Sequence, residues 1–122
     1  MVTGALTMAL AVASGAMGAH FLKAHLTPVM MQTWNTAVEY HAYHGMGLLL
    51  VGVISLYFPA QAGVKWSGYF MIAGLLLFCG SLYLLAITGI RWLGAITPFG
   101  GVSFIFAWLL LAYSALHLTW TE

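Results

Sequence analysis

Long apolar runs, separated by short polar, glycine- or proline-containing breaks, dominate the chain. Four such runs cover about residues 2–22, 36–58, 66–87 and 98–118. Each is close to the ~20 residues that a helix needs to cross ~30 Å of hydrocarbon at ~1.5 Å per residue. A backbone in lipid must satisfy its own hydrogen bonds, and the runs lack the alternation of barrel strands. The pattern therefore predicts an all-α, polytopic membrane protein, a bundle of four transmembrane helices.

A fifth, shorter helix is predicted between the first two spans. Thr27 and Pro28 are typical of a helix start, with threonine as the N-cap and proline in the first turn. Apolar residues then recur at helical spacing over residues 28–35, which suits a helix lying in the membrane interface. Thr36 and Glu39 match a capping box, in which the glutamate reaches back to the backbone N–H of the cap residue. The second span is therefore expected to begin at Thr36.

The other helix ends carry similar signals. Gly89, directly after Thr88, is typical of a glycine that ends a helix. Thr97 and Pro98 repeat the threonine–proline start of residues 27–28. We therefore expect the third span to end at Gly89 and the fourth to be capped by Thr97.

Small residues recur along the first span at spacings of three and four. They are Ala11, Gly15, Gly18 and Ala19. Such a face lets another helix approach closely in lipid. The first span is therefore expected to be the most buried helix, packed inside one bundle or against a second copy of the chain.

Composition agrees with the membrane reading. Of the 122 residues, 63% are hydrophobic and 4% are charged, whereas a soluble domain has about 25% charged residues. The length suits one transmembrane domain over residues 1–122. A net charge of +1 offers no basic face for nucleic acid. The chain has no aspartate, no paired carboxylates and no phosphate-binding glycine loop, so no enzymatic activity is predicted.

One polar cluster stands out against this background. Glu39, Tyr40, His41 and His44 lie near the start of the second span, and His20 ends the first. Ionisable groups are costly near hydrocarbon, so the cluster is a candidate ligand site. The capping box offers a purely structural role for Glu39. We expect Glu39 to lie within hydrogen-bonding reach of the Thr36 backbone or of His20, and His44 to point into the bundle.

The histidines are also candidate metal ligands. His41 and His44 are three residues apart and share one side of a helix, but Glu39 lies about 140° from His44. This helix alone therefore cannot hold an ion, and a Zn²⁺ or Cu²⁺ site would need His20 and His25 as well. Hydrogen bonding near the interface is the commoner role of such histidines, and no cofactor is expected.

Four separated motifs resemble one known family. They lie at residues 15–20, 34–44, 78–83 and 96–101. Together they are similar to the domain-of-unknown-function 423 family of small bacterial inner-membrane proteins. The family's usual features fall on His20, Glu39, Tyr40, His44, Ser81, Tyr83, Thr97, Pro98, Gly100 and Gly101.

The resemblance implies a fold and a place in the inner membrane, but no activity. His41 departs from it, because relatives often carry glutamine there, and the basic tail of many relatives is missing after Glu122. Two functions stay open. The first is a structural or accessory protein, homo-oligomeric or attached to a larger membrane complex. The alternative is a ligand-handling protein that binds a metal, haem, quinone or proton through the His/Glu cluster.

Both termini are expected to face the cytoplasm. The three basic side chains decide little, since Lys23 and Arg91 are predicted on one side, and Lys65 and the amino terminus on the other. The expectation rests on the basic tails of relatives. A reporter enzyme fused after Glu122 should be active only in the cytoplasm, and activity only in the periplasm would reverse the orientation.

Overall fold

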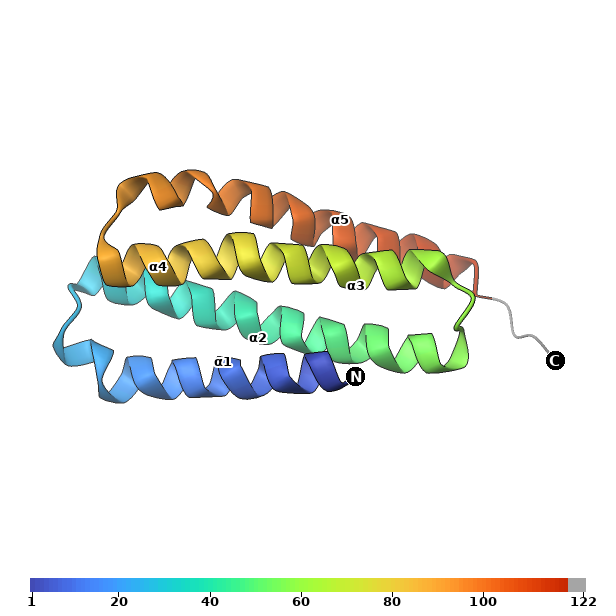
Figure 1. Ribbon diagram of the computed structural model, residues 1–122, viewed down its shortest axis with the longest axis horizontal. Helices are drawn as coiled ribbons and strands as arrows, with labels where there is room; N and C mark the ends of the chain where they lie inside the picture. The colour runs from blue at the N-terminus through green and yellow to red at the C-terminus, as the bar shows by residue number, and fades with distance from the viewer. Residues whose placement is uncertain (119–122) are drawn as a thin grey trace.

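The computed structural model describes residues 1–118, which form an antiparallel bundle of long helices (Figure 1). Glu122 lies outside the described residues. The α-helices are α1 (Val2–His20), α2 (Pro28–Tyr57), α3 (Ala62–Gly74), α4 (Gly80–Thr88) and α5 (Thr97–Leu116). The shorter elements are the 3-10 helices η1 (Leu22–Ala24) and η3 (Arg91–Ala95), and the π-helical turn η2 (Leu75–Cys79), which joins α3 to α4. All elements in the described part are helical, as predicted.

The separate interfacial helix does not exist, and that prediction was wrong. Residues 28–57 form one continuous helix of 30 residues, about 45 Å long at ~1.5 Å per residue. The Thr36 hydroxyl donates to the Gln32 carbonyl over 3.1 Å, one turn back in the same helix. Thr36 is therefore an interior residue of α2, and the capping box at residues 36–39 does not form.

The four-span bundle is corrected as well. Three helical segments are long and apolar enough to cross a membrane: Val2–Ala24, Ala62–Thr88 and Arg91–Leu116. The helix α2 is not among them, because Glu39, His41 and His44 interrupt its apolar run. It nevertheless lies beside the apolar helices (Figure 1).

Close contacts along α1 fix its position against α2. The residues of α1 that are buried are Gly4, Ala11 and Gly18, spaced seven apart. A Cβ at Gly4 would lie 2.5 Å from the Leu49 backbone nitrogen, and one at Gly18 would lie 2.7 Å from Nε1 of Trp34. Glycine is therefore required at Gly4, where the backbone of α1 meets that of α2, and at Gly18, where it meets the Trp34 ring.

The predicted packing face of α1 is only partly correct. Ala11 and Gly18 are buried, but Gly15 is half-buried and Ala19 is exposed. Within an apolar 18-residue stretch of each candidate span, 17% of the residues are buried in the first span, against 28% and 22% in the other two. The expectation that it is the most buried helix was wrong, because α1 packs chiefly on α2 and lies at the edge of the bundle (Figure 1).

Two of the predicted helix ends are confirmed. The Thr27 hydroxyl accepts a hydrogen bond from the Met30 backbone N–H, 3.3 Å away. Gly89 ends α4 with φ of 69°, a left-handed conformation that favours glycine. Thr97 is not an N-cap, because it is the first residue inside α5 and Ile96 takes the capping position.

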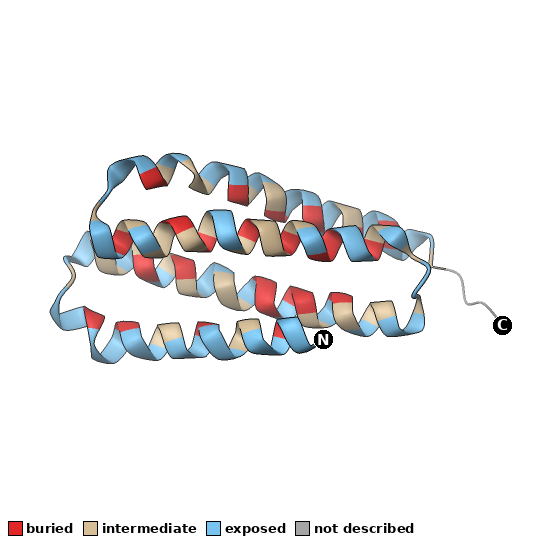
Figure 2. Cartoon of the chain, in the orientation of Figure 1, coloured by how far each residue is buried: buried red, intermediate tan, exposed pale blue. Residues whose placement is uncertain are grey.

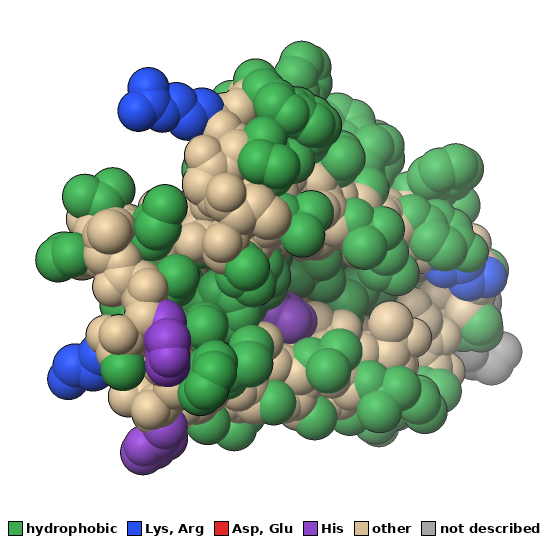
Figure 3. All heavy atoms as spheres, turned by 60° about the vertical axis from the view of Figure 1, so that its left-hand side comes forward, with side chains coloured by type: hydrophobic (Ala, Val, Ile, Leu, Met, Phe, Trp, Pro, Cys, Tyr) green, Lys and Arg blue, Asp and Glu red, His purple; other side chains and the backbone are tan. Residues whose placement is uncertain are grey.

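The core occupies the inner faces of the helices, where the buried residues gather (Figure 2). The larger cluster joins α2, α3 and α5 through Leu48, Val51, Val64, Met71, Ala107 and Leu111. A smaller cluster of Leu22, Trp34 and Ala86 lies towards the η1 end. Outside, apolar side chains cover most of the face seen in Figure 3, and basic groups lie towards its two ends. This surface suits hydrocarbon rather than water.

The close approach at Gly18 can be tested by adding one methyl group. Gly18→Ala should destabilise the fold by about 1–3 kcal/mol, because the new Cβ meets the Trp34 ring. Gly15→Ala is the matched control, since its Cβ would lie an ordinary 3.4 Å from Val38. Thermal unfolding in detergent, followed by circular dichroism, measures both. Equal stability of the two variants would contradict this packing.

Candidate functional site

Side chains of α2 form hydrogen bonds to the neighbouring helices. Nε1 of Trp34 donates to the Ser14 carbonyl of α1 over 3.0 Å. Nδ1 of His41 lies 3.0 Å from the Tyr83 hydroxyl of α4. Trp34 and Tyr83 also contact each other, with ring centroids 4.6 Å apart. These bonds connect α1, α2 and α4 towards the η1 end of the bundle.

His44 connects α2 to α5 and is buried, as predicted. Its Nδ1 donates to the Tyr40 carbonyl over 2.7 Å, and its Nε2 accepts from the indole N–H of Trp108 over 3.1 Å. Because an indole N–H only donates, Nε2 carries no proton and the imidazole is neutral. The ring also stacks on Phe104, with centroids 3.3 Å apart. Both nitrogens of His44 are therefore engaged within the protein.

Glu39 has a different partner from either expected one. It is exposed on the outer side of α2, and its Oε1 accepts a hydrogen bond from the Tyr43 hydroxyl over 2.5 Å. Neither the Thr36 backbone nor His20 contributes, and that prediction was wrong. The reason is the continuity of α2, since a carboxylate in mid-helix meets the side chain one turn later rather than a free backbone N–H.

The remaining candidates lie apart. His20 is exposed at the end of α1, and His25 binds the Phe21 carbonyl through Nδ1 over 2.9 Å. Tyr40 is exposed and contacts Phe78, with ring centroids 4.6 Å apart. Within residues 1–118, no three His, Cys, Asp or Glu side chains lie together as a metal site would require. The cluster seen in the sequence is thus several separate contacts rather than one site.

An aromatic cavity of about 500 Å³ lies between α2, η2 and α5. Its lining consists of Tyr40, Tyr43, His44, Phe78, Gly101, Phe104, Ile105 and Trp108. Sequence reasoning missed Phe78, Phe104 and Trp108, because an aromatic residue in an apolar run gives no signal of its own. The lining is aromatic and apolar apart from His44, the two tyrosine hydroxyls and the indole N–H of Trp108.

The π-helical turn shapes one wall of this cavity. Gly100 packs directly on it, since a Cβ there would lie 2.3 Å from the Phe78 backbone nitrogen. The Ser81 hydroxyl donates to the Phe78 carbonyl over 3.0 Å and lies 2.7 Å from the Thr97 hydroxyl. Because Ser81 has one hydroxyl proton, Thr97 is the donor of that second bond. The motifs at residues 78–83 and 96–101 therefore meet here and join α4 to α5.

Apolar helices of membrane-spanning length, an apolar outer surface, and His41 and His44 turned inward to other helices define an integral membrane protein. The chain belongs to the family described as Protein of unknown function (DUF423), whose model matches residues 14–101. The resemblance seen in the sequence is thereby confirmed.

The relatives carry membrane-protein names. UPF0382 membrane protein SERP0230 of Staphylococcus epidermidis is 46% identical over 116 residues, covering 95% of this chain and 93% of its own length. UPF0382 membrane protein YwdK of Bacillus subtilis is 42% identical, covering 95% of this chain and 94% of its own. No solved structure matches the chain.

The bond between Trp108 and His44 should contribute measurably to stability. Trp108→Phe removes the indole N–H and leaves Nε2 of His44 without its donor. We expect a loss of about 0.6–2 kcal/mol, the range for hydrogen bonds between membrane helices. Trp92→Phe is the control, because Trp92 is 66% exposed. Thermal unfolding in detergent should separate the two variants, and identical midpoints would show that the bond contributes nothing.

Proposed function

We propose that this protein is a structural or accessory component of the bacterial inner membrane that associates with a further transmembrane helix. The first support is that its inward-facing histidines serve as links between helices. His41 and His44 are engaged in bonds between helices of the same chain. Metal or haem ligation by His44 would require one of its two hydrogen bonds to break, so the ligand-handling alternative is not favoured for this residue.

The outer face of α1 carries the proposal. Opposite the buried Gly4, Ala11 and Gly18, the helix exposes a row of small side chains. They are Ala5, Ala9, Ala13 and Ala16, and the larger exposed side chains Leu6, Leu10 and Val12 flank this row. In lipid, small residues let a second helix come close enough for extensive van der Waals contact. This face is available because α1 packs chiefly on α2 at the edge of the bundle.

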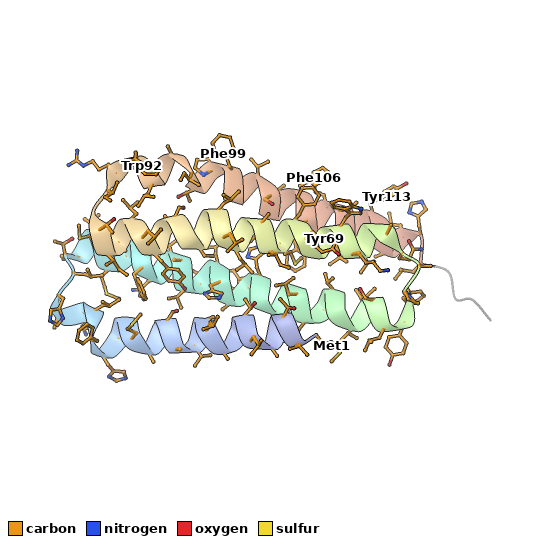
Figure 4. All side chains as sticks on the ribbon, viewed as in Figure 1. Met1, Tyr69, Trp92, Phe99, Phe106 and Tyr113 are labelled. Atoms are coloured by element: carbon orange, nitrogen blue, oxygen red, sulfur yellow. The ribbon has the colours of Figure 1, made fainter. Side chains whose placement is uncertain are left out.

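The outer face of α5 shows the contrast. Phe99, Phe106 and Tyr113 recur every seven residues and point outward (Figure 4). They are 71%, 51% and 62% exposed. Large side chains of this kind fill space against lipid tails, whereas the alanines of α1 leave a shallow surface. The two faces therefore suit different neighbours, lipid for α5 and another helix for α1.

Cysteine cross-linking in native membranes tests this association. In a Cys79→Ser background, Ala9→Cys should form an intermolecular disulfide across the outer face of α1. Leu109→Cys is the matched control, because Leu109 is 64% exposed on α5. We expect a cross-linked dimer for Ala9→Cys and none for Leu109→Cys if the neighbour is a second copy.

The native mass in lipid nanodiscs completes the test. A larger complex would appear as a particle containing other chains, and Ala9→Leu with Ala16→Leu should release this protein from it. A wild-type particle of one 13.2 kDa chain with no other protein would contradict the proposal.

A further inference from the structure

A polar groove of about 630 Å³ lies beside the first turns of α2, next to η1. Lys23 of η1 and Glu39 of α2 both line it, together with Gln32 and Asn35. The rest of the bundle surface is largely apolar, so this concentration of polar side chains is unusual for the molecule.

The two charges of the groove are opposite and do not neutralise each other. The chain has three basic and two acidic side chains in all, and this groove holds one of each sign. In the described residues Glu39 bonds to the Tyr43 hydroxyl rather than to Lys23. A carboxylate next to membrane helices is costly unless a partner compensates its charge. The groove therefore suits a ligand that carries both a positively and a negatively charged group.

We infer that this groove binds the headgroup of a zwitterionic aminophospholipid, with the ammonium on Glu39 and the phosphate on Lys23. The side-chain amides of Gln32 and Asn35 offer further donors to the phosphate oxygens. A primary ammonium has three N–H donors for the carboxylate, whereas a trimethylated choline has none. The groove should therefore prefer phosphatidylethanolamine to phosphatidylcholine.

The aromatic cavity provides a place for an acyl chain of this lipid. Glu39 lines the polar groove, and its partner Tyr43 lines the aromatic cavity between α2 and α5. The polar groove lies near the end of α2 and the aromatic cavity lies farther along that helix. A lipid with its headgroup in the polar groove and one acyl chain in the aromatic cavity would therefore have its headgroup nearer the end of α2 and its chain farther along the helix, as in a bilayer.

Lipid retention measured by native mass spectrometry tests the inference. The protein, stripped in detergent, is offered equal amounts of phosphatidylethanolamine, phosphatidylcholine and phosphatidylglycerol. We expect phosphatidylethanolamine to be retained about tenfold more strongly than either of the others, the effect of charge-assisted hydrogen bonds that only it can form at both ends.

Two variants and one control identify the side chains that bind the headgroup. Glu39→Gln should abolish the preference for phosphatidylethanolamine over phosphatidylcholine. Lys23→Gln should weaken retention of all three phosphate-bearing lipids. Lys65→Gln is the control, because Lys65 is exposed and does not line the groove. Circular dichroism melts confirm that each variant is folded.

Different results would contradict the headgroup site and the acyl-chain site. Equal retention of the three lipids by the wild type, or an unchanged preference in folded Glu39→Gln, would exclude the headgroup site. Soluble glycerophosphoethanolamine tests the role of the chain and should compete poorly. Competition as strong as that of the intact lipid would overturn the assignment of the aromatic cavity.

Discussion

Hydrogen bonds from α2 to the helices around it are the constraint on which the bundle depends. Apolar helices gain little from burying apolar surface when the surroundings are hydrocarbon, so close packing and interhelical hydrogen bonds decide their arrangement. Trp34 binds the backbone of α1, His41 binds Tyr83 of α4, and His44 accepts from Trp108 of α5. Each bond specifies a different neighbour, which makes α2 the central helix.

The same bonds explain why α2 is the least apolar of the long helices. Its histidines are turned inward, where a partner satisfies them, and the Glu39 carboxylate is turned outward with Tyr43 as its partner. The polar residues that lower the hydropathy of α2 therefore have structural partners. His41 and His44 bond to neighbouring helices, and Glu39 bonds to the Tyr43 hydroxyl on the outer side. A helix made only of leucine and valine could not fix these contacts.

Two surfaces of the molecule differ from the rest of its exterior, one by its small side chains and one by its polar side chains, and they lie on different elements. The alanine row lies on the side of α1 away from α2, and the polar groove lies between η1 and the first turns of α2. A neighbouring helix on the first surface and a lipid headgroup on the second can therefore be present together. The proposed association and the proposed lipid site stand on separate residues.

The sequence by itself determined the class of protein, most helix boundaries and two of the caps. Hydropathy is a property of one segment of about 20 residues, and the capping residues Thr27 and Gly89 act over one or two turns, so both can be read without knowing the neighbouring helices. The continuity of α2 was missed because the Thr36 side chain suits either an N-cap or a bond to the carbonyl four residues back. Only the surrounding structure chooses between the two.

The partners of His41 and His44 on other helices were decided by the tertiary structure alone. Local geometry offered Thr36 or His20 to Glu39, yet His41 meets a residue 42 positions away and His44 one 64 positions away. Such pairs depend on which helix packs on which face. That packing needs a close approach to the partner backbone at Gly4 and Gly100, and to the Trp34 ring at Gly18. A hydropathy pattern shows that helices are apolar, but the contacts between them arise only when their surfaces meet.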